Sequence, residues 1–288
     1  MPSETLYADL HLHSTASDGE LEPEALVDLA AGLGLHALAL ADHDSVAGVA
    51  RAVARGRERG LEVLTGSELT AYVGRVELHL LAYGFSLDPG SPLLKLLETV
   101  RVRRRARALE MAEKLRAVGV AITDEEILAT AGQAQAIGMV HVGAALVRRG
   151  HAADVPRAIR RFLIEGRPGH VPKMELTPRE ALEAVHARGG IVVLAHPGLE
   201  PHDELIPSLC LDGLDGFEVF YPKHNEVNRR FYAGLARRYQ KVVSGGSDFH
   251  GQRFHADAPV GSAGVTAGQW AALQDAIARR QAKLARPH

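Results

Sequence analysis

The first third of the chain alternates short apolar runs with amphipathic stretches. Residues 35–41 (LHALALA) form an apolar run that is typical of a strand buried in a parallel sheet. Apolar residues at helical spacing predict helices over 23–34 and 46–59, of which the first begins at a proline and the second is followed by a glycine. Further strands are expected at residues 5–8, 61–68 and 75–83. The order strand, helix, strand, helix, strand, strand favours a mostly parallel α/β architecture.

A long helical stretch interrupts this pattern in the middle of the chain. From residue 91 to about residue 161 the sequence predicts only helices. Thr123 begins a capping box within this stretch, and Thr177 begins another where the alternation of strands and helices resumes. We therefore expect an α/β barrel interrupted by an all-helical insert or cap, with residues 1–88 and 170–288 in the barrel and residues 89–169 in the insert.

Histidine, aspartate and glutamate residues, which are able to bind metal ions, lie at or near the ends of the apolar strands. In an extended chain His11 and His13 share a face, roughly 7 Å apart, and Asp18 follows on the next loop. An isolated H-x-H pair is more often two hydrogen-bonded histidines than a metal site, but the same residue types follow most of the other predicted strands. Catalytic residues of α/β barrels gather at this face. The candidate metal ligands are His11, His13, Asp18, His43, Glu68, His79, His196, Asp248 and His250.

The ligand types narrow the choice of metal. Cys210 is the only cysteine, which excludes a disulfide within the chain and a thiolate cluster. Histidine and carboxylate ligands suit Mn²⁺, Zn²⁺ or Fe²⁺ better than Ca²⁺ or Mg²⁺ alone. Nine candidates are too many for one ion, so we expect two or three divalent ions, Mn²⁺ before Zn²⁺ or Fe²⁺, with a bridging carboxylate. Closely spaced ions of this kind activate water and neutralise the charge on a phosphate under attack.

The composition excludes several other classes of protein. The 288 residues include 46% hydrophobic and 24% charged side chains, as is usual for a globular protein. The formal net charge of −2 argues against a surface that binds nucleic acid throughout, although a local basic patch is compatible with it. No apolar run approaches the roughly 18 residues of a membrane span, and the N-terminus lacks the pattern of a secretory signal. We expect a cytoplasmic protein with no membrane contact and no obligate protein partner.

Six motifs together resemble the PHP (polymerase and histidinol phosphatase) family. They are, in chain order, DLHLHSTASDG, ADHD, GSELT, LHLLAYG, LAHPG and GGSDFH. The resemblance implies a distorted seven-stranded β/α barrel with a trinuclear or binuclear metal centre. It also implies a distribution of ligands: His11, His13, Glu68 and Asp248 around one ion; His79 and His196 around a second ion that Glu68 bridges; and Asp18, His43 and His250 around a third.

The helical insert makes the chain similar to stand-alone bacterial members of that family. Some of these remove the 3′-phosphate of 3′,5′-nucleoside bisphosphates, and relatives trim short RNA from its 5′ end. In the insert, helical spacing places Arg103 and Arg107 on one face with Arg104 beside them, either as a solvated face or as a fork for a second phosphate. Many members carry Gly-Arg-Pro-His in the insert, and its arginine and histidine resemble contacts to the substrate phosphate. This chain has Met139 in place of the arginine and keeps His141, which the resemblance makes a candidate substrate contact. This departure weakens the bisphosphate assignment more than the phosphatase assignment.

These observations lead to one main hypothesis and three alternatives. The chain is expected to be a metal-dependent phosphohydrolase that acts through a metal-activated hydroxide on a small phosphorylated substrate, a nucleotide before other compounds. His196 and Asp248 are the candidate catalytic residues, and His224, which follows a strand, is a candidate phosphate contact. The alternatives are a phosphodiesterase that trims short RNA in the 5′-to-3′ direction, an amidohydrolase-like C–N hydrolase, and a metal-stabilised module without catalysis.

Overall fold

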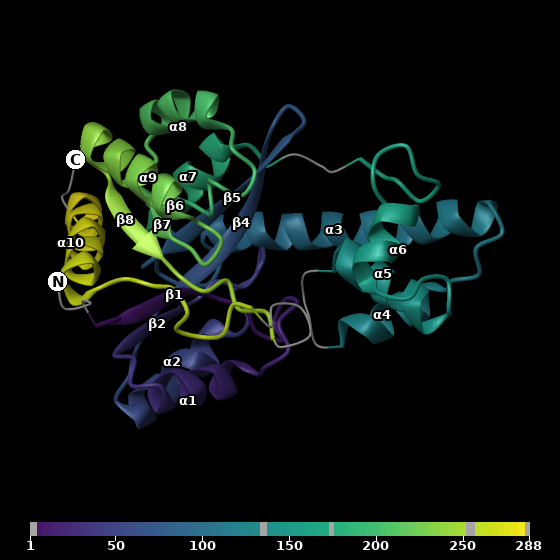
Figure 1. The fold of residues 1–288 in the computed structure, drawn as a ribbon, viewed down its shortest axis with the longest axis horizontal. Coiled ribbons are helices and arrows are strands. Elements are labelled where there is room, and N and C mark those ends of the chain that lie inside the picture. The colour runs from purple at the N-terminus through teal and green to yellow at the C-terminus, as the bar shows by residue number, and fades with distance from the viewer. Residues whose placement is uncertain (1–4, 133–136, 173–175, 252–256, 286–288) are drawn as a thin grey trace. The chain divides into compact units, whose positions relative to one another are not determined.

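The computed structural model describes residues 5–132, 137–172, 176–251 and 257–285, and these form a mixed α/β protein (Figure 1). Its strands lie in a sheet of three and a sheet of five. The strands are β1 (Ala8–Leu12), β2 (Ala37–Leu40), β3 (Glu62–Leu64), β4 (Gly66–Val73), β5 (Val76–Tyr83), β6 (Ile191–Leu194), β7 (Gly216–Phe220) and β8 (Val242–Gly245).

The chain divides into two compact units, one running up to Leu96 and again from Leu176 on, the other Leu97–Glu175. These limits lie eight and six residues beyond the expected domain boundaries, and the role of the second unit as a substrate-binding insert stays a prediction. The first unit contains both sheets. Its helices are α1 (Pro23–Gly32), α2 (Val49–Arg59), α7 (Pro178–His186), the 3₁₀ turn η1 (Asp203–Leu205), α8 (Ile206–Asp212), α9 (Glu226–Tyr239) and α10 (Ala267–Leu284).

The three-stranded sheet follows the sequence pattern closely. β1, β2 and β3 pair in parallel, and every residue of β1 and β2 is buried. The amphipathic helices α1 and α2 lie side by side beneath this sheet (Figure 1). Leu26 of α1 and Ala52 of α2 pack there against Leu38 and Leu40 of β2. Helix α2 ends where Gly60 adopts a left-handed conformation with φ 66°, which glycine reaches without steric cost.

The five-stranded sheet departs from the expected parallel arrangement. β4, β5 and β6 pair antiparallel, and only β6, β7 and β8 are parallel to one another. The reason is a two-residue turn between Val73 and Val76 in which Gly74 has φ 59°, the geometry of a tight hairpin. The expectation of a single strand over residues 61–68 is wrong as well, because β3 ends at Leu64 and Glu68 belongs to β4 in the other sheet.

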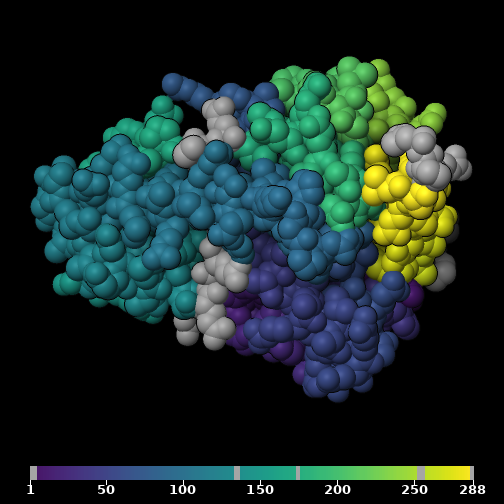
Figure 2. Space-filling model, turned by 180° about the vertical axis from the view of Figure 1, so that it is seen from behind, coloured from purple at the N-terminus to yellow at the C-terminus, as the bar shows by residue number. Residues whose placement is uncertain are grey.

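The ends of the two sheets meet around β1. Isolated bridges join Leu12 to Phe249 and His43 to Glu68, and the N–H of Asp248 donates to the carbonyl of His11 at 2.8 Å. Apolar side chains of both sheets and of α10 share one core, and Figure 2 shows α10 on the surface of this unit. Mixed α/β architecture is thus confirmed, whereas closure into a seven-stranded barrel stays a prediction.

The second unit has a hydrophobic core of its own. Buried apolar side chains from its four helices pack together, and Leu115, Ile127 and Leu146 are among the fully buried ones. The predicted capping box is present, since the Thr123 side chain accepts the N–H of Glu126 and the Glu126 side chain accepts the N–H of Thr123. Throughout the described part of the chain, no helix is both long and apolar enough to cross a bilayer. The helices are α3 (Pro92–Ala117), which begins in the first unit, α4 (Asp124–Ala131), α5 (Met139–Arg148) and α6 (Val155–Phe162).

Candidate metal centre

β1 carries the first two candidate ligands into the interior. His11 lies on the strand and His13 directly beyond its end, and both side chains are fully buried with ring centroids 5.1 Å apart. Asp9, on the same strand, accepts the N–H groups of Ser247 and Gly261, each at 2.9 Å. Burial raises the pKa of Asp9 to about 6 despite these bonds. Asp9 thereby ties β1 to the segment that carries Asp248.

Two carboxylates converge on these two imidazoles. The Nε2 atoms of His11 and His13 each lie 3.3 Å from Oε2 of Glu68, and they lie 3.3 and 3.2 Å from Oδ1 of Asp248. All four residues are buried. One ligand atom from each lies within 4.8 Å of the others, which is the arrangement of donors around a single cation.

The two carboxylate oxygens of Glu68 lie close to different histidines. Its Oε2 lies 3.2 Å from Nδ1 of His43, whereas its Oε1 lies 2.8 Å from Nδ1 of His79 and 3.1 Å from Nε2 of His196. His43, Glu68 and His79 form a second group of mutually close donors. His196 belongs to none of the three groups among the described residues, although its ring reaches Glu68. A carboxylate with ligand-type atoms at both oxygens is suited to bridging two ions.

A third group surrounds Asp18. It consists of His13, Asp18, His43 and His250, and its members lie on the loop after β1, after β2 and after β8. His250 Nε2 lies 3.5 Å from Asp18 Oδ1, and His43 Nε2 lies 3.9 Å from Asp18 Oδ2. The structure therefore brings all nine predicted residues to one place. Their assignment to particular ions stays a prediction.

Several buried atoms at the centre make no hydrogen bond within the described structure. They include Nε2 of His11, Nε2 of His13, Nδ1 of His79 and Oε2 of Glu68. Each of these imidazole nitrogens lies within 3.3 Å of a Glu68 oxygen, but none forms a hydrogen bond with it. Leaving buried polar atoms without hydrogen bonds is costly. Divalent cations would satisfy these atoms together, so the donor set fits the metal ions expected from its chemistry.

The electrostatics of the centre point the same way. Burial raises the pKa of the Glu68 carboxyl, but His43, His79 and His11 outweigh burial and hold that pKa well below its usual range. Burial also opposes charge on His13, yet the neighbouring carboxylates of Asp248 and Glu68 raise its pKa to about 10. At His43 burial prevails and lowers the pKa to about 3. Anionic carboxylates beside a mixture of protonated and neutral imidazoles make a site whose protons can exchange for a cation.

A carboxylate that the sequence patterns did not single out supports the centre. Glu218, on β7, is fully buried; its Oε1 accepts the Nδ1–H of His11 at 3.0 Å and its Oε2 accepts the N–H of His196 at 2.7 Å. Its only signal in the sequence is an acidic residue in the middle of an otherwise apolar strand, GFEVF. Asp42 also supports the centre. Its carboxylate accepts hydrogen bonds from the hydroxyls of Ser14 and Ser17 and so orders the loop that carries Asp18.

Two candidate ligands sit on strained backbone. His196 has φ 26° and Asp248 has φ 56°, in the left-handed region that non-glycine residues rarely occupy. Such strain is typical of functional sites and persists only where neighbouring contacts hold it. At His196 that contact is the bond from its N–H to Glu218, and at Asp248 it is the bond from its N–H to the carbonyl of His11.

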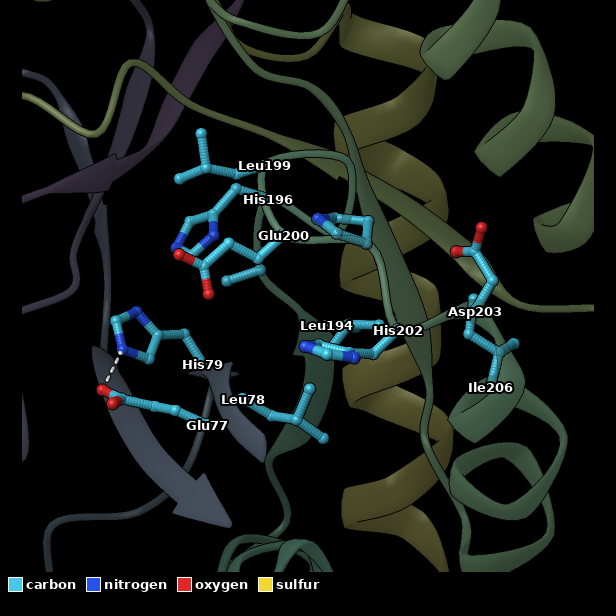
Figure 3. Close-up of a pocket in the computed structure, with 12 residues that line it drawn as sticks. Glu77, Leu78, His79, Leu194, His196, Leu199, Glu200, His202, Asp203 and Ile206 are labelled. Carbon is cyan, nitrogen blue, oxygen red and sulfur yellow. Dashed lines mark hydrogen bonds and ion pairs between the residues drawn. The ribbon is translucent and has the colours of Figure 1, made fainter. Parts of the chain in front are cut away.

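A cavity of about 230 Å³ adjoins His79 and His196 (Figure 3). In Figure 3 both imidazoles lie along one side of it, and Glu77 bonds the Nε2 of His79, at 3.1 Å. Besides His202, the rest of the lining is mainly aliphatic and acidic, and it includes Leu78, Leu194, Leu199, Ile206, Glu200 and Asp203. The cavity provides room beside the centre for part of a small substrate.

The predicted substrate contacts lie in two separate regions. In the first unit His224 is buried; its Nδ1–H donates to the carbonyl of Val219 and its Nε2 accepts the N–H of Gly198, both at 3.0 Å. Burial lowers the pKa of His224, in agreement with a neutral ring. Since both ring nitrogens are bonded to backbone, this geometry favours a structural role in the loop after His196 over the predicted phosphate contact.

The other predicted contacts lie in the second unit. The guanidinium of Arg104 packs against Gly138, whose N–H donates to Nδ1 of His141 at 3.1 Å. Arg107 is half-buried and donates to the carbonyl of Val171 at 2.9 Å, whereas Arg103 is exposed. Arg104 and His141 thus belong to one cluster at the start of α5, and Arg103 lies outside it. Their contact with a substrate stays a prediction.

A mixed α/β fold that gathers buried histidines and carboxylates into three overlapping groups defines a metal-binding hydrolase. The chain belongs to the PHP domain family, which matches residues 9–285. It is 34% identical over 248 residues to a 3′,5′-nucleoside bisphosphate phosphatase of Chromobacterium violaceum, covering 84% of this chain and 86% of that protein. It is 33% identical over 261 residues to the 5′-3′ exoribonuclease Rnm of Escherichia coli, covering 86% of this chain and 87% of the relative.

Solved structures support the same class. The chain superimposes with a TM-score of 0.85 and 30% identity on a Bifidobacterium adolescentis protein called a metal-dependent phosphoesterase, covering 96% and 97% of the two chains. A protein of Chromobacterium violaceum called an amidohydrolase matches with a TM-score of 0.81 and 30% identity, over 93% of this chain and 96% of that one. The predicted family and the predicted class of enzyme, a phosphoric ester hydrolase, are confirmed.

Proposed function

We propose that this chain removes a phosphate from a small phosphorylated nucleotide, in the manner of a 3′,5′-nucleoside bisphosphate phosphatase, with two or three divalent ions. The observation that carries the proposal is the convergence of His11, His13, Glu68 and Asp248, four buried donors within 4.8 Å of one another. Mn²⁺ is the proposed metal, before Zn²⁺ or Fe²⁺, because the donors mix imidazole with carboxylate and include no thiolate.

Different residues of the centre would hold different ions. The group around His11 and Asp248 would hold one ion, Glu68 would link it to another beside His79, and Asp18 with His43 and His250 would hold the third. Bound ions supply Lewis-acid polarisation of the phosphate and lower the pKa of water. His196 borders the cavity beside the centre, and its Nε2 faces Glu68, so it would join His79 around the second ion. The leaving group would occupy part of that cavity.

A second candidate reaction rests on the comparisons. Relatives called 5′-3′ exoribonucleases match at 33% and 34% identity, close to the 34% of the bisphosphate phosphatase. A single-stranded 5′-phosphorylated RNA presents the same chemistry to the metal centre, with a diester in place of the monoester. In the second unit, Met139 stands where many family members have arginine, which removes a positive charge expected to favour a second phosphate.

The experiment offers three kinds of compound to the Mn²⁺-loaded protein. They are adenosine 3′,5′-bisphosphate, a 5′-phosphorylated oligoribonucleotide and a panel of amides and lactones. We expect inorganic phosphate from the first, no hydrolysis of the third, and loss of all turnover when a chelator removes the metal. Release of nucleoside monophosphates from the oligonucleotide at a higher kcat/KM would favour the second candidate. Turnover that persists without metal would contradict the proposal.

A pair of arginine variants tests the proposed contacts of the second unit. Arg104→Ala should raise KM for the bisphosphate by about tenfold or more, because a charge-assisted bond to a phosphate contributes about 1.5–3 kcal/mol. Arg103→Ala, which removes the same group from an exposed position on the same helix, is the matched control. Equal effects of the two substitutions would show that general charge rather than the cluster at α5 matters.

A further inference from the structure

Glu218 is the one fully buried carboxylate of β7, and it contacts two candidate ligands from different strands. Oε1 accepts the Nδ1–H of His11 at 3.0 Å, and Oε2 accepts the backbone N–H of His196 at 2.7 Å. Because both oxygens point into the protein, their bonding capacity is directed at these two residues. Glu218 itself belongs to none of the three donor groups of the described structure.

The bond to His11 determines which ring nitrogen is available for a cation. When Nδ1 carries a proton and donates to Glu218, the lone pair of Nε2 points toward Glu68 and Asp248, each 3.3 Å away. A carboxylate behind a ligating histidine fixes the tautomer and the ring orientation and raises the basicity of the ligand. The single bond at Nδ1 thus orients the His11 ring and leaves Nε2 available for a cation.

The bond to His196 acts on the backbone instead of the ring. His196 has φ 26°, a strained conformation, and its N–H is aligned with Oε2 of Glu218. In this conformation the ring of His196 points Nε2 at Oε1 of Glu68, 3.1 Å away. Without that bond the loop between β6 and η1 could relax to an ordinary φ, and the ring would leave Glu68.

We propose that Glu218 is a positioning residue that couples two metal ions of the centre, because one carboxylate orients a ligand of each. The inference rests on the proposed metal sites, in which His11 serves one ion and His196 serves its neighbour across Glu68. Loss of Glu218 would therefore weaken both ions together. Loss of an ordinary ligand would weaken mainly its own ion.

The chain provides a matched control on the same strand. Asp215 directly precedes β7; its Oδ2 accepts from Nε2 of His186 at 2.7 Å and its Oδ1 accepts from Arg280 at 2.5 Å. This is also a carboxylate–histidine pair, with side chains 16% and 17% exposed, but it lies before the start of the strand and outside all three donor groups of the described residues. Asp215→Asn reports what such a pair contributes to stability alone.

The test compares Glu218→Gln with Asp215→Asn by titration of Mn²⁺ into the metal-free protein, with the bound ions counted by elemental analysis. Glutamine keeps the size of the side chain but replaces one acceptor oxygen with an NH₂ donor. That group would face the donor of His11 or of His196, so the side chain cannot keep its place between the two residues. We expect E218Q to weaken Mn²⁺ binding by about 10–100-fold for both ions. We expect D215N to bind Mn²⁺ like the unmodified protein even where its thermal midpoint falls.

Three results would overturn the inference. They are unchanged Mn²⁺ affinity in E218Q, weakening of one ion alone, and equal weakening in D215N. If E218Q does not fold, the ¹⁵N spectrum of His11 in the unmodified protein decides, with diamagnetic Zn²⁺ in place of Mn²⁺: Nδ1 must carry the proton while the metal is bound, and a protonated Nε2 would refute the geometry. Phosphatase activity of the unmodified protein is measured separately, so failure of the proposed function is seen independently of failure at Glu218.

Discussion

The two compact units of this chain bury different kinds of side chain. In the first unit His11, His13, Glu68 and Asp248 all lie out of solvent around one point, with their ring nitrogens and oxygens aimed at one another. In the described part of the second unit the buried side chains are apolar except for His141. Burial of charge without full hydrogen bonding destabilises a protein, whereas an apolar core stabilises it. The first unit therefore depends on a ligand in a way that the second does not.

The largest expected effect removes that ligand. Asp248→Ala deletes a carboxylate that faces both His11 and His13, and we expect metal content and phosphatase turnover to fall together, the turnover by at least about a hundredfold. Asp275→Ala, an exposed aspartate of α10, is the control and should leave both unchanged. Elemental analysis and phosphate release measure the two quantities. An inactive Asp248→Ala protein that still binds all of its metal would show that Asp248 is needed for catalysis but not for metal binding. That result would contradict the view that the buried charges of the first unit depend on the metal.

In the second unit the largest expected effect is on stability alone. Leu146 is fully buried in the core of the helices, so Leu146→Ala should lower the free energy of unfolding by about 2–5 kcal/mol, through lost burial and a cavity. Leu211→Ala, at a leucine of α8 in the first unit that is 89% exposed, should change it by less than about 0.5 kcal/mol. Urea unfolding provides the measurement for each variant. Loss of bound Mn²⁺ from folded Leu146→Ala protein would show that the two units do not differ as described.

A smaller effect concerns pH. His13 has a pKa raised to about 10, above the value near 6.5 expected when unfolded, so its proton stabilises the metal-free fold fully below pH 6.5 and less as pH rises toward 10. A bound cation must displace this proton. We therefore expect Mn²⁺ affinity to rise between pH 7 and 9, by up to about tenfold per pH unit for one released proton.

Calorimetric titration in two buffers of different protonation enthalpy counts the released protons. His151→Gln, which changes a histidine of the second unit, should show the same dependence as the unmodified protein. An Mn²⁺ affinity that is equal at pH 7 and pH 9 would mean that His13 is already neutral in the metal-free centre.

The comparison also shows what a sequence can predict. The nine ligand-type residues were recognisable because one chemistry recurs after successive apolar strands, and the structure brings them together. Glu218 was not, because a lone acidic residue in an apolar strand has no pattern of its own and acquires its meaning from His11, far away in the sequence. The second unit was easier, since capping boxes and helical spacing act locally.

The errors in the fold have a physical reason as well. A short apolar strand looks the same whether it is parallel or antiparallel, and the decisive feature between β4 and β5 was one turn at Gly74. The same holds for backbone strain, because nothing in the local sequence of His196 or Asp248 predicts a positive φ. Both features arise from contacts between distant segments.

The smallest expected effect belongs to the surface of the second unit. Arg116 donates to Asp124 at 2.8 Å, but both side chains are about 41% exposed, where water and salt screen the attraction. Arg116→Ala should therefore lower the free energy of unfolding by less than about 1 kcal/mol, and the difference should shrink further in 1 M salt. Urea unfolding at low and high salt provides both numbers. A loss as large as that of Leu146→Ala would mean that ion pairs, and not the apolar core, hold the second unit together.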